Sequence, residues 1–222
     1  MPQVFERYHA TYCRLETASE DTTCKVNADA IAIGLELTLS VEHYVNARGK
    51  DCVRGVVTNP IQQVVGWIPA NHSRVFCDLA EQGWTVRIAA SAVGFHERDR
   101  SYWIEAAVFA YQPEDELAGP LGAFVTGVME RLGKGERPDI RLSDGQVDAA
   151  LKDNAYYKAV KNTSYPKLPK GDAYYKRHRT QSEAMIMAGS ARKPGCIVGT
   201  IVFYVAVIAA VVFFVWKFIL GN

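Results

Sequence analysis

The sequence lacks the short motifs that mark the common catalytic sites. It contains no G-x-S-x-G, H-E-x-x-H or G-x-G-x-x-G segment, and its five histidines are widely separated along the chain. The segment Gly127 to Lys134 is not a P-loop, because one residue too many separates its glycines and Gly135 stands where a magnesium-binding Ser or Thr belongs. We therefore predict a protein that is not an enzyme and that uses no cofactor and no metal.

Cysteine is also sparse, and its spacing excludes a disulfide framework. The chain has five cysteines, an odd number, with no C-x-x-C pair and no histidine at zinc-ligand spacing. Nor does an apolar signal segment open the chain, because Met1 to Tyr12 is polar and of mixed charge. These absences predict reduced thiols in a cytoplasm.

Charge is unevenly distributed along the chain, although the formal net charge is only +1. Met1 to Leu151 carries 14 Lys and Arg against 21 Asp and Glu, whereas Lys152 to Gly195 carries 10 against 3. The first part is therefore acidic and the second basic. Such an asymmetry indicates two partners or two surroundings.

The longest hydrophobic run lies near the C-terminus. Cys196 to Trp216 offers 21 uncharged residues, which as a helix would span about 31 Å, the thickness of a bilayer core. A buried core helix is the alternative, but such a helix rarely stays apolar on every face for so long. We predict one transmembrane helix that anchors the chain in a lipid bilayer.

The charges around this run predict its orientation. Only Lys217 follows the span, and positive charge stays on the cytoplasmic side, so a single-pass, tail-anchored protein with a cytoplasmic N-terminal domain is expected. The pairs Gly195/Gly199 and Ala206/Ala210 would suit a homodimer of helices, and Cys196 is either palmitoylated or an idle thiol. The basic residues before the span, expected at the membrane surface, are Lys176, Arg177, Arg179, Arg192 and Lys193.

The first half of the chain has the alternation of apolar and polar residues that is typical of strands, interrupted by one helix. Asn59-Pro60 favours a turn between two strands, and Gly83 suits the C-terminal cap of the helix. Whether Val4 to Leu15 adds a further strand stays open. The expected elements are strands over 35–41, 52–57 and 63–68, a helix over 69–83, and a hairpin of 84–95 with 102–111.

Beyond Tyr111 the apolar spacing becomes helical. Apolar residues at three- and four-residue steps predict a helix over 117–132, and a capping box at Ser143 with Gln146 predicts a second one. After Val160 the chain is basic and rich in proline, and the tetrapeptide Ala-Tyr-Tyr-Lys occurs twice, at 155–158 and 173–176.

The middle of the chain resembles the HIRAN family over about Ala32 to Phe95. That family combines a strand opening with glycine, an asparagine-and-aspartate loop, a second strand, a V-G-Y-[IL]-P element and a short helix ending in glycine. The resemblance implies a small β-barrel of the kind joined to helicase-type ATPases of DNA repair and implicated in gripping single-stranded DNA ends. The corresponding segments are Gly34 to Leu37, Asn46 with Asp51, Cys52-Val53, Val65-Gly66-Trp67-Ile68-Pro69, and the helix ending at Gly83.

Together these observations predict an α+β fold with a HIRAN-like β-barrel and short helices. The expected divisions are a β-rich domain over 1–112, a helical extension over 113–160, a basic juxtamembrane linker over 161–195 and a transmembrane helix over 196–220. The linker would bind anionic lipid headgroups, serve as a solvated spacer, or contact single strands.

The candidate nucleic-acid site combines one aromatic residue with several cations. Trp67 near a strand end would stack on an unpaired base, although a tryptophan there is more often part of the core. The cations would contact phosphates or belong to a solvated surface. We predict a membrane-anchored module that binds single-stranded DNA, with a scaffold for another protein partner as the alternative. The candidate cations are Arg48, Lys50, Arg54 and Arg74.

Overall fold

The computed structural model describes residues 7–17 and 28–191, which divide into two compact units at Arg179/Thr180. No helix among these described residues is long and apolar enough to cross a membrane. The predicted span Cys196 to Trp216 lies outside them, as do Arg192 and Lys193. The prediction of a membrane anchor therefore stays a prediction.

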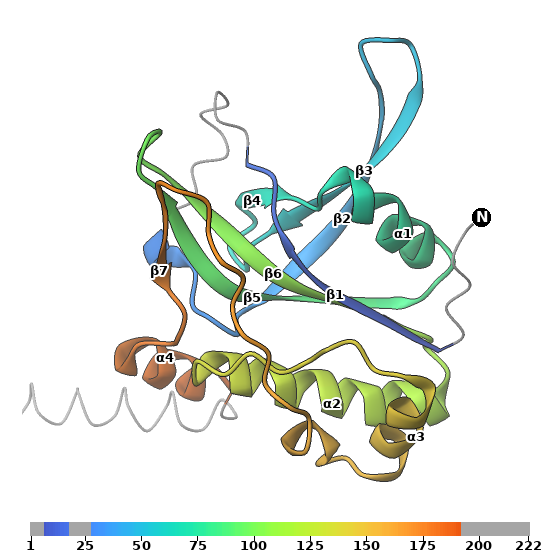
Figure 1. The fold of residues 1–222 in the computed structure, drawn as a ribbon. Helices are drawn as coiled ribbons and strands as arrows, with labels where there is room; N and C mark the ends of the chain where they lie inside the picture. The colour runs from blue at the N-terminus through green and yellow to red at the C-terminus, as the bar shows by residue number, and fades with distance from the viewer. Residues whose placement is uncertain (1–6, 18–27, 192–222) are drawn as a thin grey trace, which may run out of the picture. The chain divides into compact units, whose positions relative to one another are not determined.

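The first unit is α+β, as predicted, but its described part contains one open antiparallel sheet of seven strands where the sequence predicted a β-barrel (Figure 1). The strand order is β1-β6-β5-β2-β3-β4. β7 lies outside this order and pairs with β5 on the same edge as β2. The strands are β1 (Tyr8–Arg14), β2 (Glu36–Val45), β3 (Asp51–Thr58), β4 (Val64–Trp67), β5 (Thr85–His96), β6 (Ser101–Tyr111) and β7 (Asp172–Lys176).

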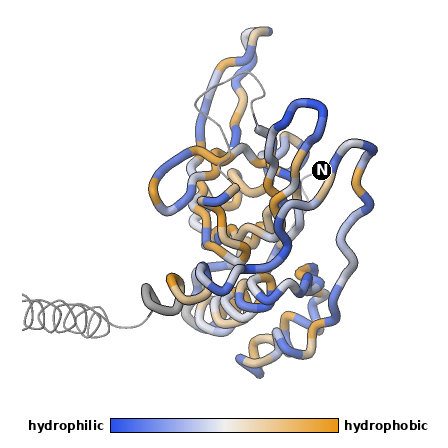
Figure 2. The backbone as a smooth tube through the Cα atoms, turned by 90° about the vertical axis from the view of Figure 1, so that its left-hand side faces the viewer, coloured by the Kyte–Doolittle hydropathy of each residue, from blue (hydrophilic) through white to orange (hydrophobic). Residues whose placement is uncertain are grey.

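The hairpin of β5 and β6 forms the middle of the sheet and confirms the pairing predicted from the sequence. The middle of β5 and most of β6 are buried, because helices cover both faces (Figure 1). The register shifts between Ala90 and Ala92, so Ser91 forms a bulge. Figure 2 shows hydrophobic residues concentrated in the sheet and hydrophilic residues at the turns.

The strands β2, β3 and β4 pair in sequence and confirm the predicted hairpin around Asn59-Pro60. β2 continues to Val45, beyond the predicted end at Val41, and forms with β3 a long hairpin that projects away from the rest of the unit (Figure 1). Alternation of side chains gives this hairpin two distinct faces.

The N-terminal segment, which the sequence left undecided, adds strand β1 beside β6. Just beyond β1, the backbone of Glu16 and that of Trp67 exchange two hydrogen bonds of 2.8 Å. This bridge links the two ends of the strand order, β1 and β4, at one point.

Two helices cover opposite faces of the sheet (Figure 1). The helix α1 (Ala70–Glu81) ends before Gly83, which has a φ of +86° as expected for the predicted cap. The helix α2 (Asp115–Gly133) buries Leu121, Phe124 and Val128 against the sheet, as the apolar spacing predicts. Burial of each such side chain stabilises the fold by roughly 1.5–3 kcal/mol.

The basic segment after α3 (Asp144–Lys152) differs from the predicted linker. Residues up to Arg179 belong to the first compact unit, and β7 pairs with β5 over Val93 to His96. The 3-10 helix η3 (Tyr156–Lys158) contacts α2, where the Tyr157 ring lies against Gly127. A second short 3-10 helix, η2, spans Ala28–Ala30. The prolines and charges of this segment predicted that it would be exposed to solvent. Its tyrosines supply enough apolar surface for it to pack against the rest of the unit.

The second unit contributes the helix α4 (Gln181–Ala191) to the described residues. Thr180 begins it: the Thr180 hydroxyl accepts a hydrogen bond from the backbone N–H of Glu183 at 3.3 Å, and the Glu183 carboxylate accepts one from the Thr180 N–H at 2.9 Å. This reciprocal pair is a capping box.

Candidate functional site

Two of the predicted site residues, Arg54 and Trp67, lie together on the sheet. The guanidinium carbon of Arg54 is 5.1 Å from the ring centre of Trp67 and 5.2 Å from that of Tyr44. Nε of Arg54 donates a hydrogen bond of 2.8 Å to the carboxylate of Glu42. We call these four residues the Arg54 cluster.

The strand register places the Arg54 cluster on one face. Arg54 is opposite Glu42 across the β2–β3 ladder, and Trp67 is opposite Val56 across the β3–β4 ladder. The neighbouring residue Gly55 belongs to the other face, where the side chains of Leu39 and Ile68 lie against it and Val57 is fully buried. The face that carries Arg54 is therefore the less buried face of β3.

The members of the Arg54 cluster are accessible to solvent. The side chains of Arg54 and Glu42 are 40% and 45% exposed, Tyr44 is exposed, and Trp67 is half-buried. The hydrogen bond between Arg54 and Glu42 raises the pKa of Arg54 and lowers the pKa of Glu42. Trp67 is therefore neither enclosed in the core nor fully open to solvent. Part of its indole ring is available for contact with a ligand.

The other three predicted cations lie elsewhere. Arg48 and Lys50 occupy the tip of the projecting β2–β3 hairpin, where the side-chain oxygen of Asn46 accepts hydrogen bonds from their backbone N–H groups at 2.9 Å and 3.1 Å. Arg74 lies on α1 and pairs with Asp78 at 3.8 Å. The structure therefore does not bring these cations together in one groove with Trp67.

Sequence reasoning missed Tyr44 and Glu42. The alternation that predicted a strand over 35–41 continues through Glu42 and Tyr44, and extending the strand would have placed both on the face of Arg54. Their cross-strand partner could be identified only with the register of the hairpin.

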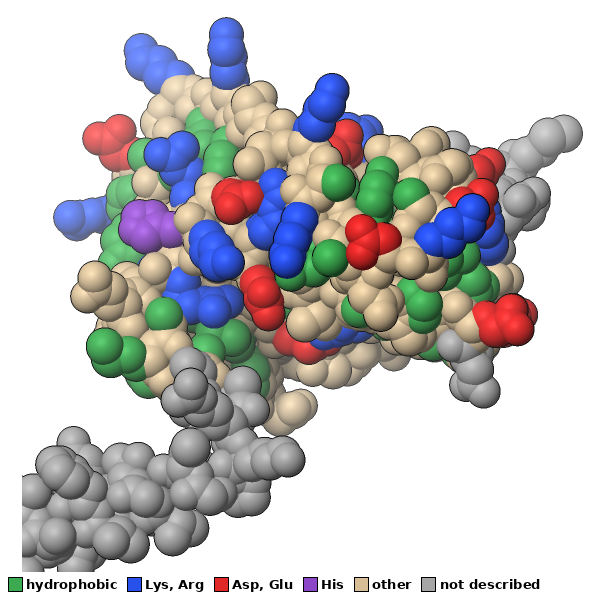
Figure 3. Space-filling model, turned by 90° about the horizontal axis from the view of Figure 1, so that it is seen from below, with side chains coloured by type: hydrophobic (Ala, Val, Ile, Leu, Met, Phe, Trp, Pro, Cys, Tyr) green, Lys and Arg blue, Asp and Glu red, His purple; other side chains and the backbone are tan. Residues whose placement is uncertain are grey.

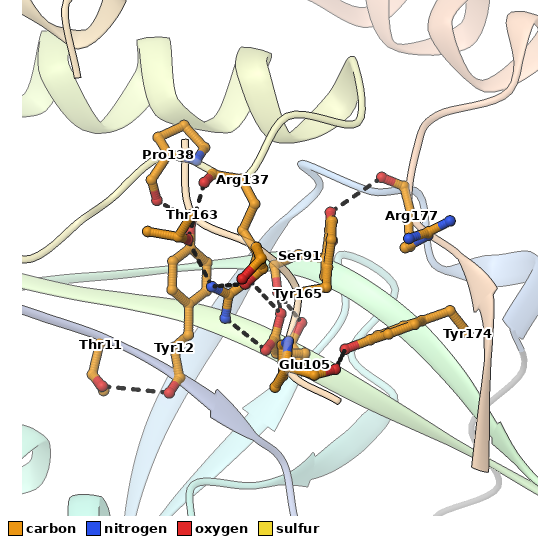
Figure 4. A network of polar contacts seen from close by, with 12 residues as sticks. Thr11, Tyr12, Ser91, Glu105, Arg137, Pro138, Thr163, Tyr165, Tyr174 and Arg177 are labelled. Atoms are coloured by element: carbon orange, nitrogen blue, oxygen red, sulfur yellow. Dashed lines mark hydrogen bonds and ion pairs between the residues drawn. The ribbon is translucent and has the colours of Figure 1, made fainter. Parts of the chain in front are cut away.

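A second arginine has the same kind of neighbours in the interior. The guanidinium of Arg137 donates to both carboxylate oxygens of Glu105, at 2.9 Å and 3.3 Å, and lies 3.8 Å from the Tyr12 ring centre and 5.5 Å from that of Tyr165 (Figure 4). The Ser91 hydroxyl donates to Glu105 at 2.7 Å. We call Tyr12, Glu105, Arg137 and Tyr165 the Arg137 cluster.

The Arg137 cluster joins four separate parts of the chain. Its side chains come from β1, from β6, from the turn after α2 and from the segment before β7. Burial raises the pKa of Tyr12 strongly although Arg137 opposes the shift, so its hydroxyl stays protonated and donates to the carbonyl of Pro138 at 2.8 Å. This arrangement is suited to holding the C-terminal segment on the sheet.

The described members of the predicted membrane surface contact their own chain. The ammonium of Lys176 donates to the Ile31 carbonyl at 3.3 Å, and Nε of Arg179 donates to the Ile33 carbonyl at 3.0 Å. Arg177 lies between two tyrosine rings. Contact of these cations with lipid stays a prediction.

Titratable side chains do not converge on a metal-binding group in the described ranges 7–17 and 28–191. Of the cysteines in those ranges, Cys13 and Cys77 are buried free thiols and Cys52 is a half-buried one. The histidine with the most charged surroundings is His96, which contacts Asp172 and lies 3.3 Å from Asp99.

Comparison with known proteins finds no family model that matches the chain, and no curated protein and no solved structure that is similar to it. The resemblance to the HIRAN family therefore stays a prediction from the sequence.

Proposed function

We propose that this protein is a non-catalytic binding module, held at a membrane by residues 196–216, whose Arg54 cluster binds unpaired bases of single-stranded DNA. The observation that carries this proposal is the position of the Arg54 guanidinium near the rings of both Tyr44 and Trp67 on the less buried face of β3.

Stacking supplies most of the expected affinity. An aromatic ring on an exposed sheet contributes about 1–3 kcal/mol for each base that stacks on it, largely independent of sequence. Arg54 adds a planar cation that stacks on bases and contacts phosphate. Its pairing with Glu42 orients the guanidinium, at the cost of neutralising part of its charge.

The charge of the first unit is compatible with a weak electrostatic contribution. Met1 to Arg179 carries 22 Lys and Arg against 23 Asp and Glu, because the unit includes most of the basic segment. A nearly neutral unit neither attracts nor repels a polyanion strongly. The proposed binding therefore depends on stacking more than on phosphate neutralisation, and salt should weaken it only modestly.

The experiment is a titration of the full-length protein, in detergent, with a fluorescent single-stranded oligonucleotide at low salt. Trp67→Ala should weaken binding by about 5- to 150-fold, the equivalent of one stacked base, and Trp67→Phe should restore part of the loss. Ile61→Ala is the matched control, because it removes an exposed side chain from the adjoining β3–β4 turn without changing the rings.

Two results would contradict the DNA proposal. One is the absence of saturable binding by the wild-type protein, and the other is binding that Trp67→Ala and Ile61→Ala weaken equally. Binding that persists in Trp67→Ala would move the site away from the Arg54 cluster.

Membrane attachment is tested separately. The 21 uncharged residues from Cys196 to Trp216, with Arg192 and Lys193 before them, support an integral segment whose basic flank faces the cytoplasm. The full-length protein should stay with membranes after washing with alkaline carbonate, and deletion of 196–216 should release it. Release of the intact chain by carbonate would refute the anchor.

A protein partner is the second candidate for the Arg54 surface. The projecting β2–β3 hairpin exposes Tyr44 at 39% on the face of Arg54, which is the kind of aromatic contact that protein interfaces use. Crosslinking in membranes, with and without nuclease, separates the two candidates. One dominant protein adduct that persists after nuclease treatment and is lost in Tyr44→Ala would favour the protein partner.

A further inference from the structure

A pocket of about 520 Å³ opens on the first unit, away from the Arg54 cluster. Its wall combines the turn after α2, the segment 162–165 and the two residues that follow β7. Figure 4 shows Arg137 and Arg177 on two sides of Tyr165, which also lines the pocket. The charged residues of its lining are Lys134, Glu136, Arg137, Arg177 and His178.

The acidic groups near this pocket are already paired with arginines. The Glu136 carboxylate accepts a hydrogen bond of 2.6 Å from Arg131, and Arg137 is bound to the buried Glu105. Within the described part of the chain, the side chains of Lys134 and Arg177 form neither an ion pair nor a hydrogen bond, although the charge of Lys134 helps to lower the pKa of Glu136. The pocket therefore holds an excess of positive charge.

Arg177 is also held in a defined orientation. Its guanidinium carbon lies 5.5 Å from the ring centres of both Tyr165 and Tyr174. Tyr174 is fixed in turn, because its hydroxyl donates to the Pro166 carbonyl at 3.0 Å. An arginine placed between two rings loses little further freedom when it binds an anion, while its N–H groups remain available as donors.

We propose that this pocket binds the phosphate group of a phosphate monoester. Lys134 and Arg177 are two cations from separate segments of the pocket wall, and such a pair suits a doubly charged tetrahedral anion better than a single carboxylate, which one arginine satisfies. Seen from below, the surface of the molecule carries Lys and Arg side chains interspersed with Asp and Glu, and several Lys and Arg side chains lie near one histidine (Figure 3).

The size of the pocket indicates that the phosphate carries an organic group. Sites for small molecules typically enclose about 300–1,000 Å³, and the pocket lies within this range. The phosphate belongs to a soluble metabolite or to a lipid headgroup, which share this chemistry. The Arg54 cluster takes no part in the pocket, so the proposal is independent of DNA binding.

The test is calorimetric titration of the full-length protein in neutral detergent with inorganic phosphate and with glycerol 3-phosphate. Saturable binding with a dissociation constant of about 1 mM or lower is expected for the ester. Arg177→Gln should weaken it by about tenfold or more, because a charge-assisted hydrogen bond is lost. Lys134→Gln should act in the same direction, which guards against misfolding of one variant.

Arg48→Gln is the matched control, since it removes the same charge from the exposed tip of the β2–β3 hairpin. It should leave phosphate binding unchanged, and so should Trp67→Ala. The proposal is overturned if neither phosphate compound binds, or if Arg48→Gln weakens binding as much as Arg177→Gln does. The second outcome would attribute the affinity to net charge.

Phosphatidic acid in the micelles distinguishes the two sources of phosphate. If it raises the apparent dissociation constant for glycerol 3-phosphate in the wild type, the lipid headgroup occupies the pocket. If it has no effect while Arg177→Gln still weakens binding, the ligand is a soluble ester. Either outcome supports the phosphate site.

Discussion

The two arginine clusters combine the same chemical groups in different surroundings. Arg54 and Arg137 each lie between two aromatic rings and each bind one glutamate. The side chains of the Arg54 pair are 40% and 45% exposed, whereas those of the Arg137 pair are 10% and 7% exposed. Burial, not composition, therefore assigns their roles.

Burial changes how much an ion pair contributes to stability and how costly it is to remove one of its partners. An exposed ion pair contributes little, because water and salt screen it. A buried pair costs desolvation for both charges, so the loss of one partner leaves the other charge without compensation. We infer that the Arg137 cluster holds the fold together and that the Arg54 cluster is free to exchange its neighbours for a ligand.

A third arginine lies between these extremes. Arg14 is 4.2 Å from the Trp103 ring centre and 2.6 Å from the Asp172 carboxylate, with side-chain exposures of 44% for the arginine and 2% for the aspartate. It connects β1 to β7 as the Arg137 cluster connects β1 to the segment before β7. The three arrangements form a series that mutations can test.

The largest effect is expected for Arg137→Ala, which leaves Glu105 buried without its partner. The free energy of unfolding should fall by about 3–5 kcal/mol, measured by denaturant titration of the full-length protein in detergent. The double variant Arg137→Met/Glu105→Gln should lose less, because no unpaired charge remains. If Arg137→Ala costs no more than Arg54→Ala, the distinction between the two clusters fails.

The next largest effect on stability is expected where η3 packs on α2, just before the segment that contains Tyr165. A Cβ on Gly127 would lie 2.3 Å from the Tyr157 ring, so Gly127→Ala should displace η3 and cost about 1–3 kcal/mol. Gly119→Ala is the control in the same helix, because no atom lies within 4 Å of its Cβ. That change should be neutral or stabilise α2 by about 0.5–1 kcal/mol. Thermal melting compares them, and equal effects would contradict the packing argument.

A smaller effect is expected at low pH through Asp172. Burial alone would raise its pKa, but hydrogen bonds from Arg14 and His96 outweigh burial, so the pKa of Asp172 lies below its ordinary value. Its folded pKa is thus lower than its unfolded one, and its contribution to stability is complete above the unfolded pKa and lost as the pH falls through the folded pKa.

Asp172→Asn should therefore reduce stability at neutral pH and flatten the loss of stability on acidification. Thermal melting between neutral and strongly acidic pH measures both quantities. A variant whose acid dependence matches that of the wild type would show that Asp172 does not link the strands through its charge.

The smallest effect on stability is expected for Arg54→Ala. Its exposed pair with Glu42 should contribute less than about 1 kcal/mol, and the coupling in a double-mutant cycle with Glu42→Ala should be similarly small. Oligonucleotide binding should fall nonetheless. A large loss of stability without a change in binding would reverse the roles assigned to the two clusters.

Much of the fold could be predicted from local patterns. Alternation and turn residues located the hairpins of β3 with β4 and of β5 with β6, and helical spacing located α2. The helix after Ser143 followed from its capping box, in which Gln146 accepts from the Ser143 N–H at 2.9 Å. These features depend on residues a few positions apart, which is why the chain order alone revealed them.

The candidate sites could be predicted only in part, because their members meet across strands. Trp67 and Arg54 were identified as candidates, but their contact with Tyr44 depends on the strand register. The pocket was missed entirely, since Lys134 and Arg177 are brought together by the docking of β7 on β5. No spacing in the sequence marks such a pair.

The repeated tetrapeptide Ala-Tyr-Tyr-Lys shows the same difference between local sequence and tertiary structure within four residues. Its first copy forms the 3-10 helix η3 against α2, and its second copy forms the strand β7. Identical residues adopt two structures because one faces a glycine on a helix and the other a free edge of β5.

The amino-acid sequence by itself determined the local elements, the apolar C-terminal run and the opposite charges of the segments 1–151 and 152–195. Tertiary structure alone decided that the basic segment up to Arg179 folds onto the acidic domain and nearly cancels its charge. The physical reason is that periodicity reports only near neighbours. Burial and pairing depend on which distant surfaces exclude water from one another.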